Sequence, residues 1–329
     1  MTTPPDPTEL SSAVPAAAGL PPVVPDHELL RLIGSGSSGQ VWLAKNTLGT
    51  YRAVKIVPER QSRQGCAENE FKGILKFEPV SRLHDGLVDI LQVGRNEAAG
   101  YFYYVMELAD DVVCGQNIIP KTYLPRTLGR DQARLKRLPV AECVRLGAAI
   151  ASALGFLHQH GLIHRDIKPD NIIFVNGTPK LADIGLVAEA SGVQSQTGTQ
   201  GFFPPEGSGT IRADIYSLGK VLYEISTGKD RNDYPVLPEL PGNAAEDEAL
   251  LLLNGIILKA CRAKPWERYQ TAEEMMLALL NFQFNRDHLR RKRNEQFLTQ
   301  VARIVWPIIA GGIIFAMLWR LIWLLKHPH

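Results

Sequence analysis

The hydrophobic pattern of this chain changes its period once, and that change limits the folds that the chain can adopt. Four short runs rich in β-branched and aromatic residues, separated by turns with Gly or Asn, lie at 29–33, 41–44, 51–57 and 101–106. After about residue 138, apolar residues recur at helical spacing over 140–160, 211–226 and 250–261. We therefore expect an α+β protein, with a small antiparallel sheet followed by a larger helical part.

The composition is that of a folded protein. Of the 329 residues, 45% are hydrophobic and 21% are charged, so most of the chain can bury a core. The 36 Lys and Arg residues nearly balance the 34 Asp and Glu residues, which gives no case for a nucleic-acid binder. The four cysteines lie far apart without a CxxC pair, so we expect neither a zinc site nor a disulfide scaffold.

Two segments fall outside this pattern. Residues 1–25 contain seven prolines between small or polar residues and no Lys or Arg. We expect a disordered leader there, partly in the polyproline II conformation, and no secretory signal. Residues 110–138 are punctuated by Pro and Gly, and we interpret them as a long connection with one short helix.

The C-terminal end carries an apolar run, 304–325, interrupted only by Arg320. As a helix, its 22 residues would rise about 33 Å, roughly the thickness of the hydrocarbon core of a bilayer. Trp306, Trp319 and Trp323 lie near its ends, where the membrane interfaces would be. The preceding flank has a charge of +4, from six bases (Arg286, Arg290, Arg291, Lys292, Arg293 and Arg303) against Asp287 and Glu295.

These features predict a single-pass protein of the cell membrane. Because basic flanks stay on the cytoplasmic side, the domain before the apolar run would be cytoplasmic, and the run itself would contact lipid. The alternative is a buried C-terminal helix that packs on the folded domain. Gly311 and Gly312 would permit close helix packing, so the run is also a candidate for dimerisation.

Gly34, Gly36 and Gly39 lie in the sequence GSGSSGQV, between two predicted strands. Glycines at such a turn leave backbone N–H groups free to approach a phosphate and accept positive φ without strain. A dinucleotide-binding fold also carries GxGxxG, but a helix follows there, whereas Val41 begins a run typical of a strand. On this motif alone, a glycine-rich hairpin without a ligand is the simpler interpretation.

Lys55 follows Ala53 in an apolar strand, where its ammonium group could reach phosphates beneath the glycine-rich turn. A lysine with apolar flanks needs a counter-charge. The helix expected over 66–77 carries Glu68 and Glu70, and we favour Glu70 as the partner.

The strongest motif is HRDIKPDN at 164–171, followed by DIG at 183–185. Phosphoryl transfer needs a carboxylate that positions the acceptor hydroxyl and oxygen ligands that hold Mg²⁺ against the phosphates. Asp166, Asn171 and Asp183 supply this set, since magnesium prefers oxygen ligands to His or Cys. Lys168 adds a positive charge beside Asp166.

In order and spacing, these motifs resemble those of a eukaryotic-type (Hanks-type) protein kinase domain over residues 27–285. Further matches are GTQGFFPPE at 198–206, DIYSLG at 214–219 and Arg268, which the family pairs with the Glu of the first motif. The resemblance implies a bilobal kinase fold, with a β-rich N-lobe at about 26–107 and an α-rich C-lobe at about 108–285. A basic juxtamembrane segment (286–303), the membrane helix (304–325) and a short tail (326–329) would follow.

The resemblance implies a role for each motif residue. Asp166 would accept the proton of the substrate hydroxyl, and Lys55, paired with Glu70, would bind the α- and β-phosphates of ATP. Asn171 and Asp183 would ligate Mg²⁺. The residues expected around ATP, with the hinge at 106–108, are Gly34, Gly36, Gly39, Val41, Ala53, Lys55, Glu107, Leu108 and Asp183.

Two positions indicate the type of substrate. Lys168 after HRD and Thr199 in the GT motif resemble serine/threonine kinases, so the expected substrates are Ser and Thr hydroxyls of proteins. Ser195 and Thr197 in the activation segment are candidates for autophosphorylation, with the phosphate bound by Arg165. The alternative is that Arg165 forms an ion pair inside the C-lobe.

The chain departs from the family pattern in three places. Ile184 replaces the Phe of DFG, and an aliphatic side chain should fill the same apolar space. PPE at 204–206 replaces APE, which together with the leader and the membrane tail resembles bacterial members. The 110–138 segment is longer than usual, and it would either alter the peptide-binding entrance or bind a partner.

Three functions are open from the sequence: a membrane-anchored Ser/Thr kinase that uses Mg·ATP, a pseudokinase scaffold, and a small-molecule kinase of related fold. A scaffold would not need to retain Lys55, Asp166, Asn171 and Asp183 together. HRDIKP combined with the GT…PPE segment favours protein substrates over small molecules.

Overall fold

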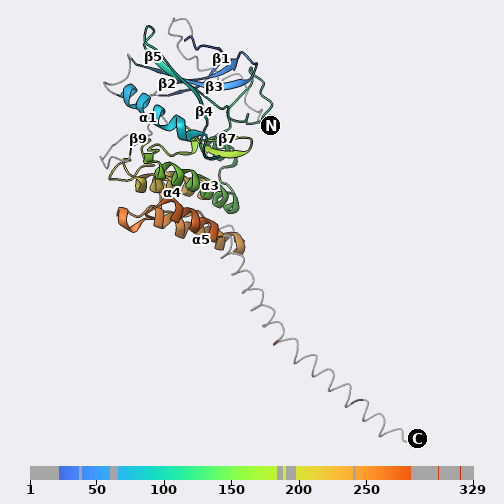
Figure 1. Cartoon of the computed structure of the whole chain (residues 1–329). Helices are drawn as coiled ribbons and strands as arrows, with labels where there is room; N and C mark the ends of the chain where they lie inside the picture. Colours follow the sequence, from blue (N-terminus) through green and yellow to red (C-terminus); the bar gives the residue numbers. More distant parts are fainter. Residues whose placement is uncertain are drawn as a thin grey trace, which may run out of the picture.

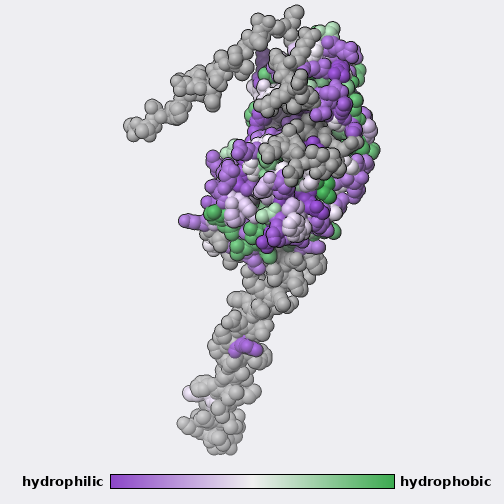
Figure 2. All heavy atoms as spheres, turned by 90° about the vertical axis from the view of Figure 1, so that its left-hand side faces the viewer, coloured by the Kyte–Doolittle hydropathy of each residue, from purple (hydrophilic) through white to green (hydrophobic). Residues whose placement is uncertain are grey.

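The computed structural model describes residues 22–36, 39–59, 66–183, 188–189, 198–239 and 242–282, together with Arg303 and Trp319. These residues form a strand-rich lobe and a helix-rich lobe (Figure 1). The predicted bilobal α+β fold is therefore confirmed. On the face shown in Figure 2 the described surface is mostly hydrophilic, with smaller hydrophobic areas between.

The N-lobe is built on a five-stranded antiparallel sheet with strand order β1-β2-β3-β5-β4. Four strands match the predicted apolar runs. The fifth, β4, was not predicted, because only Ile90 in it is fully buried and polar residues break its apolar run. The strands are β1 (His27–Gly36), β2 (Gly39–Asn46), β3 (Tyr51–Pro58), β4 (Ile90–Asn96) and β5 (Tyr101–Met106).

Helix α1 (Cys66–Ser81) packs on this sheet and buries Ile74 and Phe77. The ring of Phe71 meets the ring of Phe102 on β5 edge-on, with the centroids 5.2 Å apart. The helix runs past its predicted end near Phe77 to Ser81, whose hydroxyl donates a hydrogen bond of 2.8 Å to the carbonyl of Glu78. This packing fixes the face of α1 that is turned toward the sheet.

The C-lobe is mainly helical. Helix α3 (Val140–Gln159) packs against α4 (Ile211–Thr227), and α4 packs against α5 (Ala244–Ala260), as Figure 1 shows. A Cβ at Gly147 of α3 would lie 2.9 Å from Leu222, so glycine allows α3 and α4 to approach closely. The remaining elements are α2 (Leu128–Leu135), β6 (Leu162–Ile163), β7 (Ile172–Val175), β8 (Thr178–Leu181), β9 (Ala188–Glu189) and the 3₁₀ turns η1 (Pro169–Asn171), η3 (Arg231–Asp233) and η4 (Pro265–Glu267).

The helix boundaries follow local sequence signals. Thr210 caps α4, since its hydroxyl accepts from the backbone N–H of Ala213 at 3.1 Å. Gly228 ends the same helix in the left-handed conformation, with φ of 71°. The predicted helices match α3, α4 and α5, although α5 begins earlier than expected, with Glu246 and Asp247 in its first turn.

The two lobes share one continuous core, which contains Phe77 and Phe102 of the N-lobe as well as Leu154 and Leu222 of the C-lobe. The chain before β4 also joins β8 directly. Backbone hydrogen bonds link Val88 N–H to the carbonyl of Leu181 at 3.0 Å, and Leu181 N–H to the carbonyl of Gly86 at 2.8 Å. Strand β8 is therefore held between the lobes, next to the site described below.

Among the described residues, one helix is long and apolar enough to cross a membrane, and it is α3. Because 61% of its most apolar 18-residue stretch is buried within the fold, we interpret α3 as a core helix of the C-lobe. The apolar run at 304–325 lies outside the described residues apart from Trp319, so its predicted role stays a prediction.

The described chain begins inside the predicted leader. The hydroxyl of Tyr101 accepts from Val23 N–H at 3.0 Å and donates to Val23 O at 2.7 Å. Val24 is buried against the sheet. Residues 22–25 therefore belong to the N-lobe, and residues 1–21 lie outside the description.

Candidate active site

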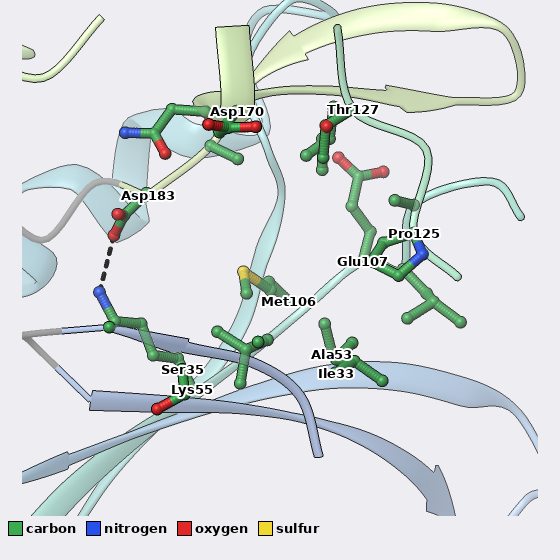
Figure 3. A pocket seen from close by; sticks show the side chains of 18 of the residues that line it. Ile33, Ser35, Ala53, Lys55, Met106, Glu107, Pro125, Thr127, Asp170 and Asp183 are labelled. Carbon is green, nitrogen blue, oxygen red and sulfur yellow. Dashed lines mark hydrogen bonds and ion pairs between the residues drawn. The ribbon is translucent and has the colours of Figure 1, made fainter. Parts of the chain in front are cut away.

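A cavity of about 420 Å³ lies between the lobes. Figure 3 shows its side chains, with Lys55 and Asp183 at one end and Glu107, Pro125 and Thr127 at the other. Every residue predicted to surround ATP lines this cavity, as do Lys168 and Asn171; the predicted set is Gly34, Gly36, Gly39, Val41, Ala53, Lys55, Glu107, Leu108 and Asp183.

The glycine-rich turn joins β1 to β2 above the cavity. Gly39 has φ of 145°, and a Cβ there would lie 2.3 Å from the carbonyl oxygen of Ile56 on β3. Only glycine fits this position without moving the sheet. Because β2 pairs with β3 there, the same register sets Val41 opposite Lys55.

Lys55 forms two ion pairs. Its Nζ lies 3.0 Å from Oε1 of Glu70 on α1 and 2.7 Å from Oδ1 of Asp183, the contact drawn as a dashed line in Figure 3. The predicted pairing with Glu70 is confirmed. Glu68 points elsewhere and lies 3.2 Å from Arg95.

Burial and charge act against each other on these groups. Burial would lower the pKa of Lys55, but Tyr104, Asp183 and Glu70 outweigh it and hold that pKa well above its usual value. Burial would likewise raise the pKa of Asp183, but Lys55 lowers it below its usual value. Lys55 is therefore a cation and Asp183 an anion at neutral pH.

Asp166 sits in a closed network of hydrogen bonds. Its Oδ2 accepts from Lys168 Nζ at 2.8 Å and from Asn171 Nδ2 at 2.9 Å. Its Oδ1 accepts from the backbone N–H of Thr199 at 2.9 Å and from the Thr199 hydroxyl at 2.8 Å, and Lys168 also reaches that hydroxyl at 2.8 Å. The hydroxyl of Thr199 is thus bound both by the carboxylate of Asp166 and by Lys168.

The loop that carries Asp166 is anchored by Asp214, a buried residue of α4. The carboxylate of Asp214 accepts from the backbone N–H groups of His164 and Arg165 at 2.9 Å each, and from Nε2 of His158 at 2.9 Å. Arg165 has φ of 71°, a strained conformation for a residue with a side chain. Asp214 therefore stabilises the strained backbone that positions Asp166.

Asn171 and Asp183 fit the predicted metal role by their donor chemistry. Nδ2 of Asn171 donates to both the carbonyl and the Oδ2 of Asp166, which leaves the amide oxygen as the atom that can bind a cation. Asp183 is anionic and bonded to Lys55 through Oδ1, so Oδ2 is its second possible ligand atom. Two oxygens from the protein leave room for phosphate oxygens and water, as Mg²⁺ prefers.

The hinge holds a contact that sequence reasoning missed. Oε1 of Glu107 accepts from Lys180 Nζ on β8 at 2.6 Å and from Asp89 N–H at 2.9 Å. The Glu107 side chain is therefore bound to the C-lobe, and its neighbours Leu108 and Ala109 line the cavity. Lys180 had no signal in the sequence, because a lysine on a strand is usually on a solvated face.

The end of the activation segment is fixed by an ion pair. Arg268 is fully buried, and its Nη2 donates to Oε2 of Glu206 at 3.0 Å while Nη1 binds Oε1. The predicted pairing of these two residues is confirmed. Residues 184–187 and 190–197, with Ile184, Ser195 and Thr197, lie outside the described residues.

The protein kinase domain family matches residues 27–300, and the chain belongs to that family. The serine/threonine-protein kinase PknB of Mycobacterium tuberculosis is 31% identical over 280 residues, covering 77% of this chain and 42% of the relative. PrkC of Bacillus subtilis is 30% identical over 292 residues, covering 81% and 42%. A probable serine/threonine-protein kinase of Clostridium perfringens is 28% identical over 305 residues, covering 86% and 42%.

These matches confirm the resemblance to bacterial Hanks-type serine/threonine kinases. The chain spans less than half the length of the curated relatives that it matches.

Replacing Lys55 by Met should lower the rate of phosphoryl transfer on the order of 10²–10³-fold, because it removes a preorganised charge from the end of the cavity where the phosphates are expected. Glu70→Gln should lower it less, since the amide can still accept a hydrogen bond from Lys55. Glu68→Gln is the matched control on the same helix and should have no effect. Steady-state rates of the three purified variants test this, and a loss in Glu68→Gln with none in Glu70→Gln would refute the pairing.

Proposed function

We propose that this chain is a serine/threonine protein kinase, which transfers the γ-phosphate of ATP to Ser and Thr hydroxyls of proteins and to hydroxyls of its own chain. The observation that carries the proposal is the network around Asp166. There a carboxylate and Lys168 bind one threonine hydroxyl from two sides, close to Asn171 and to the nucleotide cavity. A substrate hydroxyl that replaced Thr199 would meet the same two groups.

Each residue then has a defined task. Asp166 orients the substrate hydroxyl and accepts its proton as the oxygen attacks the γ-phosphorus. Lys168 lies beside that hydroxyl and balances negative charge on the transferred phosphoryl group. Lys55, held by Glu70, binds the α- and β-phosphates.

Asn171 and Asp183 would hold Mg²⁺, which neutralises charge on the β- and γ-phosphate oxygens when it is bound. The adenine would lie between the apolar residues Val41 and Ala53 and the hinge backbone at Leu108, all of which line the cavity. With the adenine at the hinge, the phosphates would lie at the Lys55 end of the cavity shown in Figure 3.

A pseudokinase scaffold is the second candidate. It would need the fold and a nucleotide cavity without the full set of reactive groups. The intact Asp166 network and the Lys55–Glu70 pair support catalysis over this alternative. The relatives named as serine/threonine-protein kinases support protein substrates over small molecules.

The test uses full-length protein with ATP labelled in the γ-phosphate and a generic basic protein as acceptor. We expect label on phosphoserine and phosphothreonine but none on phosphotyrosine, and none when the magnesium is chelated. Label on phosphotyrosine alone would contradict the specificity, and labelling that survives chelation would contradict the metal requirement.

We also propose that the chain is a single-pass protein of the cell membrane, with the kinase domain at about 26–285 in the cytoplasm, the basic segment at 286–303 and the membrane helix at 304–325. Two features support this: the length of the apolar run and the charge of its flank.

Deletion of residues 301–329 should give soluble and still active kinase, since the apolar run would bury its surface in lipid rather than in the domain. Full-length protein should pellet with membranes and resist alkaline carbonate. Both are measured by fractionation followed by the labelling assay. A packed C-terminal helix predicts the opposite, because its removal would expose a core face and cause aggregation.

A further inference from the structure

The segment between the hinge and α2, residues 110–126, is a compact loop held by hydrogen bonds of its own side chains. Asp110 and Asp111 are both buried. The carboxylate of Asp110 accepts from the backbone N–H groups of Asn176 and Gly177 at 2.8 Å each, which attaches the loop to the turn after β7. The carboxylate of Asp111 accepts from the backbone N–H groups of Val113 and Cys114, at 2.8 Å each, and of Leu124, at 2.7 Å.

Tyr123 connects this loop to both sides of the nucleotide cavity. Tyr123 is 1% exposed, and its hydroxyl donates to the carbonyl of Ala109, the residue directly after the hinge, at 3.0 Å. Its own backbone carbonyl accepts a hydrogen bond from Nη2 of Arg31 on β1. Tyr123, Ala109 and Pro125 all line the cavity. Tyr123 therefore contacts both the chain directly after the hinge and β1, the strand that leads into the glycine-rich turn.

The position of this contact within the cavity shows which part of a nucleotide it would affect. Pro125 of this loop and Thr127, which caps α2 directly after it, lie at the end away from Lys55 and Asp183 in Figure 3. The phosphates would lie near Lys55 and Asp183, so the adenosine portion would lie near the loop. Arg31 on β1, whose Nη2 donates to the carbonyl of Tyr123, links this end to the N-lobe.

We propose that Tyr123 is a positioning residue for the adenosine portion of the nucleotide, and that the 110–126 loop is a fixed wall of the nucleotide cavity. The hydroxyl of Tyr123 fixes the carbonyl of Ala109, next to Leu108, and the backbone carbonyl of Tyr123 fixes β1 through Arg31. The distance between the hinge and β1, which would enclose the adenine, is therefore preset. The inference rests on the proposed use of ATP. It does not depend on phosphoryl transfer.

The test measures the binding of adenosine and of Mg·ATP to full-length protein in detergent by titration calorimetry. Tyr123→Phe removes only the hydroxyl, and it should weaken both ligands by the same factor of about five, the value of one ordinary hydrogen bond. Lys55→Met should weaken ATP but leave adenosine unchanged. Arg31→Met should resemble Tyr123→Phe, and Arg31→Lys should recover part of the affinity.

Tyr223→Phe is the matched control. The hydroxyl of Tyr223 donates to the carbonyl of Val236 at 2.6 Å, within the C-lobe and away from the residues that line the cavity. This variant should lose a similar amount of thermal stability without a change in either affinity, which separates positioning from a merely structural role.

Wild-type affinity of Tyr123→Phe for both ligands would overturn the inference, as would a loss confined to ATP or a wild-type protein that does not bind adenosine. If the wild type binds both ligands but labels no protein, the proposed activity fails, and the affinities of Tyr123→Phe for the two ligands still decide the role of Tyr123.

Discussion

Asp166→Asn should lower kcat on the order of 10²–10⁴-fold, because the carboxamide keeps the shape of the side chain but cannot accept the proton of the substrate hydroxyl. The affinity for ATP should stay close to that of the wild type, since Asp166 is absent from the residues that line the nucleotide cavity. The two quantities are measured separately, by steady-state labelling and by nucleotide titration.

Asp170→Asn provides the control for this result. Asp170 is exposed and lies in the same loop, four residues further on, where it lines the nucleotide cavity, but its carboxylate takes no part in the Asp166 network. This variant should keep most of its kcat. Equal turnover of Asp166→Asn and the wild type would show that another group accepts the proton.

Arg268→Met should destabilise the protein by about 3 kcal/mol, because it leaves the carboxylate of Glu206 without its buried partner. The Arg268 side chain is fully buried, and it also donates to the backbone carbonyls of Arg212, Arg262 and Ala263, so contacts to four residues are lost together. Chemical denaturation followed by circular dichroism measures the free energy of unfolding.

The matched control is Arg145→Met. Arg145 pairs with Glu142 at 2.6 Å, but its side chain is half exposed, and exposed pairs contribute about 0–1 kcal/mol. Its loss should be small. Equal effects of the two substitutions would contradict the structural role given to the Arg268–Glu206 pair.

The residues that carry the chemistry could be predicted from the sequence because their identity is restricted by that chemistry. Lys55, Asp166 and Asn171 are recognised by residue type and order, and the fold brings them to one cleft. Glu70 could also be distinguished from Glu68 as the partner of Lys55 by its position on the helix. It shares the buried face of α1 with Ala67 and Ile74, whereas Glu68 is exposed.

The contacts that support these residues could not be predicted, because they join positions far apart in the chain. Tyr123 binds Ala109, 14 residues away, and Arg31, 92 residues away. Lys180 binds Glu107 across 73 residues. A tyrosine in a Pro- and Gly-rich segment and a lysine in a short strand carry no local signal of such partners.

Strand β4 could not be predicted for a different reason. Strand β4 pairs with β5 along its length, but it has few buried positions, so its sequence lacks the apolar pattern of a strand. Its pairing with β5 is regular except for one irregularity near Ile90, whereas only Ile90 and Val93 of its side chains pack in or against the core.

The central claim, that this chain is an active protein kinase, is tested most directly by measuring two rates in one reaction of the full-length wild type with Mg·ATP and an acceptor protein. The first is the formation of ADP, and the second is the formation of phosphoserine and phosphothreonine. We predict that the two rates are equal and that both disappear in Asp166→Asn. ADP formed without phosphoprotein, or bound ATP with neither product, would contradict the claim.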